Sequence, residues 1–82
     1  MRSFFYIEHL DAVCDSTAGH MITAYVYEVV NYSPVFVGNC GLADIHPLED
    51  CIILVKDFLI HEKIIAKGEK INLVCVKKDR LI

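Results

Sequence analysis

The segment HMITAYVYEVV, from His20 to Val30, constrains the fold more than any other part of the sequence. It is rich in the β-branched and aromatic residues that favour strands. The turn-forming segment Asn31–Pro34 interrupts it, and apolar residues return at Val35–Val37 before the glycine-containing segment Gly38–Gly41. This order predicts two strands joined by a hairpin.

Two further segments have strand character. Phe4–Leu10 is aromatic and β-branched at its start and alternates afterwards, whereas the following Asp15–Gly19 has the composition of a loop. Near the C-terminus, Ile71–Val76 is almost continuously apolar. That character predicts a strand in a central position, covered on both faces.

A helix is predicted to follow the hairpin. Pro47 suits the first helical position because it has no N–H to leave unpaired, which would make His46 the N-cap, with Asp44 as a possible substitute. Glu49 and Asp50 then fall in the first turn, where the helix dipole favours acidic side chains. The apolar positions that follow share one helical face: Leu48, Cys51, Ile52, Val55, Phe58 and Leu59.

Two endings of this helix are consistent with the sequence. It could continue to Lys67, with Gly68 as the residue after its C-cap, or Ile64–Ala66 could form a short strand. With either ending, we expect residues 1–82 to form a single α+β domain. It would be a mostly antiparallel four-stranded sheet in the order β-β-β-α-β, with one amphipathic helix packed on one face.

Composition limits how much of this chain one core can hide. Of the 82 residues, 55% are hydrophobic, above the usual share of about 45–50%. A domain this small buries a smaller fraction of its surface than a larger one, so the surplus predicts a partner protein, a homodimer or a ligand. No apolar run approaches the roughly 18 residues of a membrane span, and no signal-peptide core is evident. We therefore expect a cytoplasmic protein with no membrane contact.

Two surfaces are candidates for this surplus. On the helix, the apolar face that begins at Leu48 is the core stripe. Ile53, Ile60 and Ile64 fall together on the opposite side, where either a partner or the following chain would cover them. On the sheet, alternation within each strand separates aliphatic from aromatic side chains. If the aliphatic sides align beneath the helix, the aromatic residues gather on the other face: Phe4, Tyr6, Tyr25, Tyr27 and Phe36.

This aromatic face has two interpretations. Tyrosine combines a large apolar area with a polar tip and is enriched in binding surfaces, which favours a contact face. Cross-strand aromatic pairing that only stabilises the sheet is the alternative. The candidate partner-binding residues are these five aromatic residues together with Ile53 and Ile60.

Cysteine and histidine occur twice in the spacing C-x₅-H, at Cys14–His20 and Cys40–His46. Structural zinc sites use much tighter pairs than the four cysteines of this chain provide. Cys51 and Cys75 lie in apolar segments, where reduced cysteine acts as a small core residue. We therefore assign no metal, cofactor or catalytic residue and expect no enzyme activity. A Cys/His metal-binding or thiol-dependent protein is the alternative.

The net charge is −3, from eleven acidic and eight basic residues. Nucleic-acid binding needs a positive surface to engage phosphates, and the one basic cluster, Lys77–Arg80, contains an acid. A sheet that stacks its rings on single-stranded RNA is therefore the weaker alternative. The leading hypothesis is a non-enzymatic protein-protein interaction module. It would act as a homodimer or as a compact inhibitor of a larger complex, in the manner of a phage-encoded antagonist of host defence.

Overall fold

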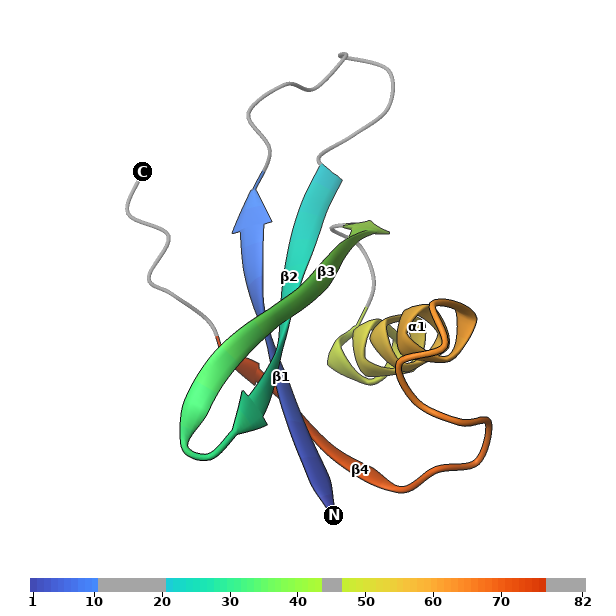
Figure 1. Cartoon of the computed structure of the whole chain (residues 1–82). Coiled ribbons are helices and arrows are strands. Elements are labelled where there is room, and N and C mark those ends of the chain that lie inside the picture. Colours follow the sequence, from blue (N-terminus) through green and yellow to red (C-terminus); the bar gives the residue numbers. More distant parts are fainter. Residues whose placement is uncertain (11–20, 44–46, 77–82) are drawn as a thin grey trace.

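The computed structural model describes residues 1–10, 21–43 and 47–76 (Figure 1). Its elements are, in chain order, β1 (Arg2–Leu10), β2 (Met21–Val30), β3 (Ser33–Ala43), α1 (Leu48–His61) and β4 (Ile71–Val76). The strands form one sheet in the spatial order β3-β2-β1-β4, in which only the β1–β4 pair is parallel. The predicted α+β class, with a mostly antiparallel sheet and one helix, is confirmed.

Several sequence-based expectations lie outside the described residues. They concern the Asp15–Gly19 loop, the Cys14–His20 pair, the proposed caps Asp44 and His46, and the basic cluster Lys77–Arg80. The strand predicted from His20 is described from Met21 onward.

β2 and β3 form the predicted hairpin, joined by a two-residue turn of Asn31 and Tyr32. Both residues have positive φ, 50° and 64°, which is the geometry that matches the twist of a two-residue hairpin. β3 is longer than predicted, because it continues through Gly38–Gly41 to Ala43. A bulge at Val37 bends the strand while it stays paired with β2.

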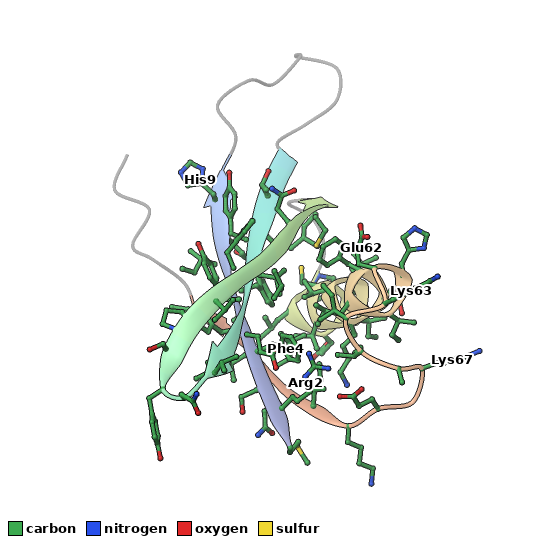
Figure 2. The ribbon with its side chains drawn as sticks, viewed as in Figure 1. Arg2, Phe4, His9, Glu62, Lys63 and Lys67 are labelled. Carbon is green, nitrogen blue, oxygen red and sulfur yellow. The ribbon has the colours of Figure 1, made fainter. Side chains whose placement is uncertain are left out.

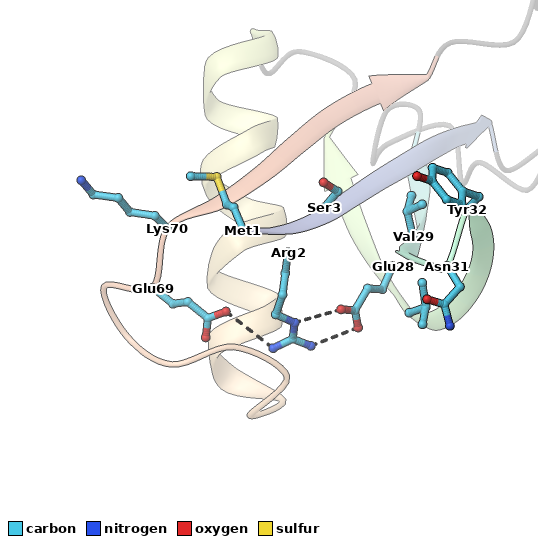
Figure 3. Close-up of a pocket in the computed structure, with 10 residues that line it drawn as sticks. Met1, Arg2, Ser3, Glu28, Val29, Asn31, Tyr32, Glu69 and Lys70 are labelled. Carbon is cyan, nitrogen blue, oxygen red and sulfur yellow. Dashed lines mark hydrogen bonds and ion pairs between the residues drawn. The ribbon is translucent and has the colours of Figure 1, made fainter.

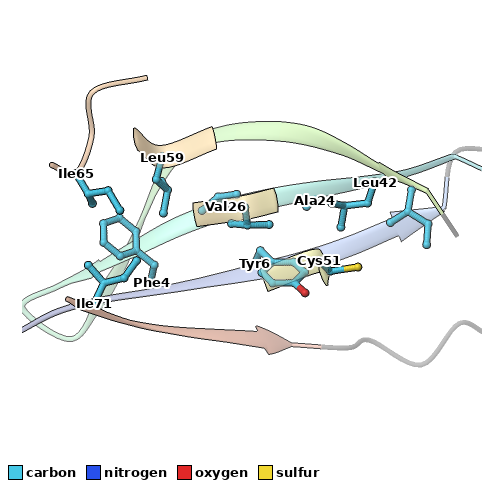
Figure 4. Close-up of a cluster of buried hydrophobic side chains, with 11 residues drawn as sticks. Phe4, Tyr6, Ala24, Val26, Leu42, Cys51, Leu59, Ile65 and Ile71 are labelled. Carbon is cyan, nitrogen blue, oxygen red and sulfur yellow. The ribbon is translucent and has the colours of Figure 1, made fainter. Parts of the chain in front are cut away.

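The core lies between α1 and one face of the sheet (Figure 4). Phe4 and Tyr6 of β1 are 1% and 0% exposed and are the largest fully buried side chains. The other buried residues come from β2, β3, α1, the segment after α1, and β4: Ile22, Ala24, Val26, Leu42, Cys51, Val55, Leu59, Ile65 and Ile71.

The predicted position of Phe4 and Tyr6 on the face away from the helix is therefore wrong. Across β1 and β2, Tyr6 pairs with Val26 and Phe5 pairs with Tyr27, and paired residues project from the same face. Tyr6 consequently joins the aliphatic side chains beneath α1, and Phe5 joins the tyrosines on the other face. Alternation shows which residues of one strand share a face, but the register between strands decides which faces match.

β4 is an edge strand and does not have the predicted central position. It pairs with β1 alone, and its residues alternate between the core and the exposed surface. Val74 and Val76 are 57% and 41% exposed. The apolar residues of β4 therefore contribute to two surfaces, since one side of the strand contacts the core and the other side lies on the face away from α1.

α1 packs mainly through the predicted stripe. Cys51, Val55 and Leu59 are buried, Ile52 and Phe58 pack half-buried against the core, and Leu48 is exposed.

The start of α1 differs from the prediction by one position. Pro47 is the N-cap residue and not the first helical residue, because its ψ of 161° is extended. Its carbonyl oxygen accepts hydrogen bonds from the N–H groups of Asp50 at 3.0 Å and Cys51 at 3.1 Å. Glu49 and Asp50 lie in the first turn, as predicted.

The segment between α1 and β4 contains neither the helical extension to Lys67 nor the short strand at Ile64–Ala66. Instead, the N–H of Lys63 donates to the Ile60 carbonyl at 3.0 Å, and the N–H of Ile64 donates to the Leu59 carbonyl at 2.9 Å. This is the Schellman pattern, which closes helix ends. Lys63 has a φ of 61° and occupies the position that glycine usually takes.

Replacing Lys63 with glycine is therefore expected to stabilise the fold. The left-handed conformation costs a residue with a Cβ atom roughly 1–2 kcal/mol, and glycine would remove this cost. Part of the gain in stability is offset, because glycine has a greater entropy in the unfolded chain. We expect Lys63→Gly to raise the free energy of unfolding by about 0.5–1 kcal/mol in urea titrations. Lys67→Gly is the control, because Lys67 has no positive φ. A gain from both variants would contradict the assignment to the Schellman position.

The hydroxyl of Tyr6 is buried and makes no hydrogen bond of normal geometry to the described residues. Burial strongly raises the pKa of Tyr6, and the nearby Cys75 thiol adds to the increase. The phenol is therefore neutral at physiological pH, and its buried polar atom opposes folding.

Tyr6→Phe is expected to increase the free energy of unfolding by about 1 kcal/mol, because it removes an unsatisfied buried hydroxyl and keeps the ring. Chemical denaturation of the purified chain measures this change. Tyr27→Phe is the matched control, since Tyr27 is only half-buried and is expected to change stability by less than about 0.5 kcal/mol. A loss of stability in Tyr6→Phe would show that the hydroxyl has a partner.

Candidate functional site

The face of the sheet opposite α1 carries the surplus apolar side chains. They come from all four strands, and we call them together the open face: Phe5, Ile7, Tyr25, Tyr27, Val29, Phe36, Val74 and Val76. The strand register arranges them in rows: Phe5 lies between Tyr27 and Val74, and Ile7 lies between Tyr25 and Val76. Within the described residues, α1 is the one helix, and it packs against the other face (Figure 1).

The aromatic rings of the open face contact one another. Phe5 stacks on Tyr27 with a centroid distance of 5.1 Å, and Phe36 meets the edge of Tyr27 at 5.5 Å. Tyr25 lies 6.4 Å from Phe36 and 6.0 Å from the His9 ring. These are favourable aromatic geometries, so the rings hold one another in place.

Exposure on the open face is highest at the two edges of the sheet. Phe36 on β3 is 52% exposed, and Val74 on β4 is 57% exposed. Phe5 and Tyr27, which lie on the central strands, are half-buried by their neighbours. The result is a broad surface with accessible apolar atoms across its whole width, and not a narrow groove.

Charged side chains of the strands avoid the open face. Arg2, Glu8 and Glu28 all project toward the α1 side, because they pair with Ile71, Ala24 and Phe4. Figure 2 shows Arg2 and Phe4 on that side of β1, with Glu62, Lys63 and Lys67 on the segment after α1. His9 lies at the far end of β1, at the rim of the open face.

The predicted binding residues are thus divided among three environments. Tyr25, Tyr27 and Phe36 lie on the open face, whereas Phe4 and Tyr6 belong to the core. On α1, Ile53 is 55% exposed, as predicted for a residue opposite the core stripe.

Ile60 differs from the expectation, because it is half-buried and packs against the core, as does Ile64. The chain after α1 folds back and places Ile65 in the core, so it covers this end of the helix. Of the two alternatives weighed from the sequence, covering by the following chain therefore applies to Ile60 and Ile64.

Five members of the open face are absent from the predicted binding residues: Phe5, Ile7, Val29, Val74 and Val76. For β1, the strand faces were separated correctly but matched to the wrong faces of β2. For β4, the sequence did contain a signal: apolar residues occur on both sides of the strand, whereas one helix can cover only one face of the sheet.

A shallow pocket lies beside the start of β1 (Figure 3). Arg2 lies in it and binds Glu28 through two hydrogen bonds of 2.9 and 3.0 Å, and it donates to the Ile64 carbonyl at 2.7 Å. Glu69 lies 3.6 Å from the same guanidinium group. The hydrogen bond from Arg2 lowers the pKa of Glu28. The guanidinium group of Arg2 therefore links β1 to β2 and to the segment after α1.

The three described cysteines lie at buried or half-buried positions of the fold. Cys40, Cys51 and Cys75 form no disulfide, and burial, with a smaller contribution from Cys51, raises the pKa of Cys40. A raised pKa reduces the thiolate fraction on which reactivity depends. No three metal-binding side chains converge within the described residues, and the His partners of both C-x₅-H pairs lie outside them.

None of the helical residues described here forms a helix long and apolar enough to cross a membrane. No protein-family model matches the chain, and no curated protein or solved structure is significantly similar to it.

Proposed function

We propose that this chain is a non-enzymatic protein-binding module that docks through the open face. One observation carries the proposal: apolar side chains from all four strands share a face onto which no strand directs an Asp, Glu, Lys or Arg side chain. Antiparallel sheets with one solvated face normally alternate apolar and polar residues. A sheet that is apolar on both faces needs a second layer.

The chemistry of the open face favours a protein as the partner. Tyr25 and Tyr27 supply large rings with hydroxyl tips, the residue type enriched at protein interfaces. A nucleic acid would require cations beside the rings to bind its phosphates, and the strands direct Arg2, their one Arg or Lys residue, to the α1 side.

The module is proposed to act by occupying a surface of its partner. Within that role, a compact inhibitor of a larger complex, such as a phage-encoded antagonist of host defence, suits a small acidic chain that contributes one apolar sheet face. We place it in the cytoplasm, where its thiols would remain reduced.

The proposal is tested by photo-cross-linking in cells that express the chain. A benzophenone side chain replaces Phe36 on the open face or, as the matched control, Ile53 on α1; the two positions are 52% and 55% exposed. We expect a discrete protein adduct at position 36 and none at position 53. The adduct should disappear when Tyr25→Ala and Tyr27→Ala are added, while the far-UV circular dichroism is retained. Equal adducts at both positions, or none at position 36, would refute docking through the open face.

A further inference from the structure

We infer that the open face is covered by a second copy of this chain, packed sheet against sheet. The inference rests on the proposed function and names the partner of that site. Two twisted sheets pack face to face about 10 Å apart with their strands within about 30° of each other. Two copies would then form four layers, helix–sheet–sheet–helix, in which both faces of each sheet are buried.

Charge is the first reason for choosing a second copy. A face that meets its own copy across a two-fold axis places each charged group near an identical one, so charges on such a face repel. The chain has a net charge of −3, yet Glu8 and Glu28 of the strands point away from the open face. The open face is therefore self-compatible, in spite of the charge of the whole chain.

The pattern across the open face is the second reason. Apolar residues and aromatic rings occupy its centre, whereas the polar residues lie toward the ends of its strands or on edge strand β3: Ser3, His9, Thr23, Asn72 and Asn39. An apolar centre with a polar rim is the usual composition of a protein interface. Because the rings already stack on one another, association would order few additional side chains.

Area is the third reason. Four strands about 4.8 Å apart, each contributing about seven residues at about 3.3 Å per residue, give a footprint of roughly 440 Å². Projecting side chains make the accessible area larger than this flat footprint. Two copies together therefore approach the lower end of the interval of about 1,200–2,000 Å² found for specific interfaces.

The test is sedimentation equilibrium of the full chain and three lysine variants over a range of concentrations. We expect the unmodified chain to have twice its monomer mass of 9.3 kDa. Val74→Lys and Phe36→Lys should each weaken the dimer at least about 30-fold, because each places two desolvated cations in the interface. Ile53→Lys is the matched control: it is 55% exposed, against 57% for Val74, but lies on α1, so the dimer should persist.

The two open-face variants also exclude pairing through a sheet edge. Val74 lies on edge strand β4 and Phe36 on the opposite edge strand β3, so a two-fold edge-to-edge dimer, which uses the same edge of both copies, would respond to only one of them. Loss of the dimer in one variant alone, or its persistence in both, would overturn face-to-face packing.

A chain that stays monomeric at every concentration would also overturn the second copy as occupant. The cross-linking experiment at position 36 then decides separately whether the open face binds a different protein. Thermal unfolding of each variant by circular dichroism verifies that a loss of mass reflects dissociation of a folded dimer.

Discussion

Replacing Phe4 with alanine is expected to lower the free energy of unfolding by about 3–5 kcal/mol. Phe4 is 1% exposed and packs in the layer between the sheet and α1, where alanine would leave a cavity (Figure 4). A single core in a chain of this size supplies little more than about 3–5 kcal/mol of net stability. Phe4→Ala should therefore be largely unfolded at 25 °C, as judged by the loss of far-UV circular dichroism and of a cooperative urea transition.

The same substitution at Phe36 is the matched control, because it removes the same atoms from the open face. Phe36 is 52% exposed, so Phe36→Ala should cost less than about 1 kcal/mol when measured at a concentration low enough to keep the chain monomeric. Equal losses in the two variants would contradict the division of the rings between core and open face.

The contrast between Phe4 in the core and Phe36 on the open face separates what the sequence could predict from what it could not. The alternation of Ile22, Ala24 and Val26 with Tyr25 and Tyr27 predicted the two faces of β2 correctly, since the side-chain period of a strand is fixed by backbone geometry. The class of the fold and the position of α1 followed from similarly local patterns.

Matching β1 to β2 required information that is not local. The expectation that aromatic side chains would gather on one face placed Phe4 with Tyr25, whereas the register pairs Phe4 with Glu28. Both Phe4 and Phe5 are aromatic, so residue type could not identify the inward one. A shift of one residue exchanges them, and only packing beneath α1 determines which register is adopted.

The position of β4 depends on topology in the same way. Its five apolar residues, interrupted only by Asn72, fit either a central strand covered on both faces or an edge strand whose second side is exposed. The second arrangement adds Val74 and Val76 to the open face, which therefore spans the full width of the sheet. The apolar surplus was predictable from composition, whereas its location required the strand order.

Gly38→Ala is expected to destabilise the fold by about 1–3 kcal/mol, for a reason that lies in the approach of α1 to β3. A Cβ atom at Gly38 would come within 2.7 Å of Cζ and 3.3 Å of Cε2 of the Phe58 ring. Gly38 also has a φ of 156°, next to the bulge at Val37. Gly68→Ala isolates the backbone contribution, because Gly68 has a φ of 83° but nothing within 4 Å of its Cβ position. It should cost only about 1 kcal/mol in urea denaturation.

A double-mutant cycle between Gly38 and Phe58 separates crowding from backbone strain. If the ring of Phe58 causes most of the loss, Gly38→Ala should cost at least about 1 kcal/mol less in a Phe58→Leu background than in the unmodified chain. The smaller leucine side chain leaves room for the new methyl group, whereas the φ of Gly38 is unaffected by the change on α1. If Gly38→Ala costs the same in both backgrounds, the backbone of the bulge, and not the close approach of α1 to β3, requires glycine at this position.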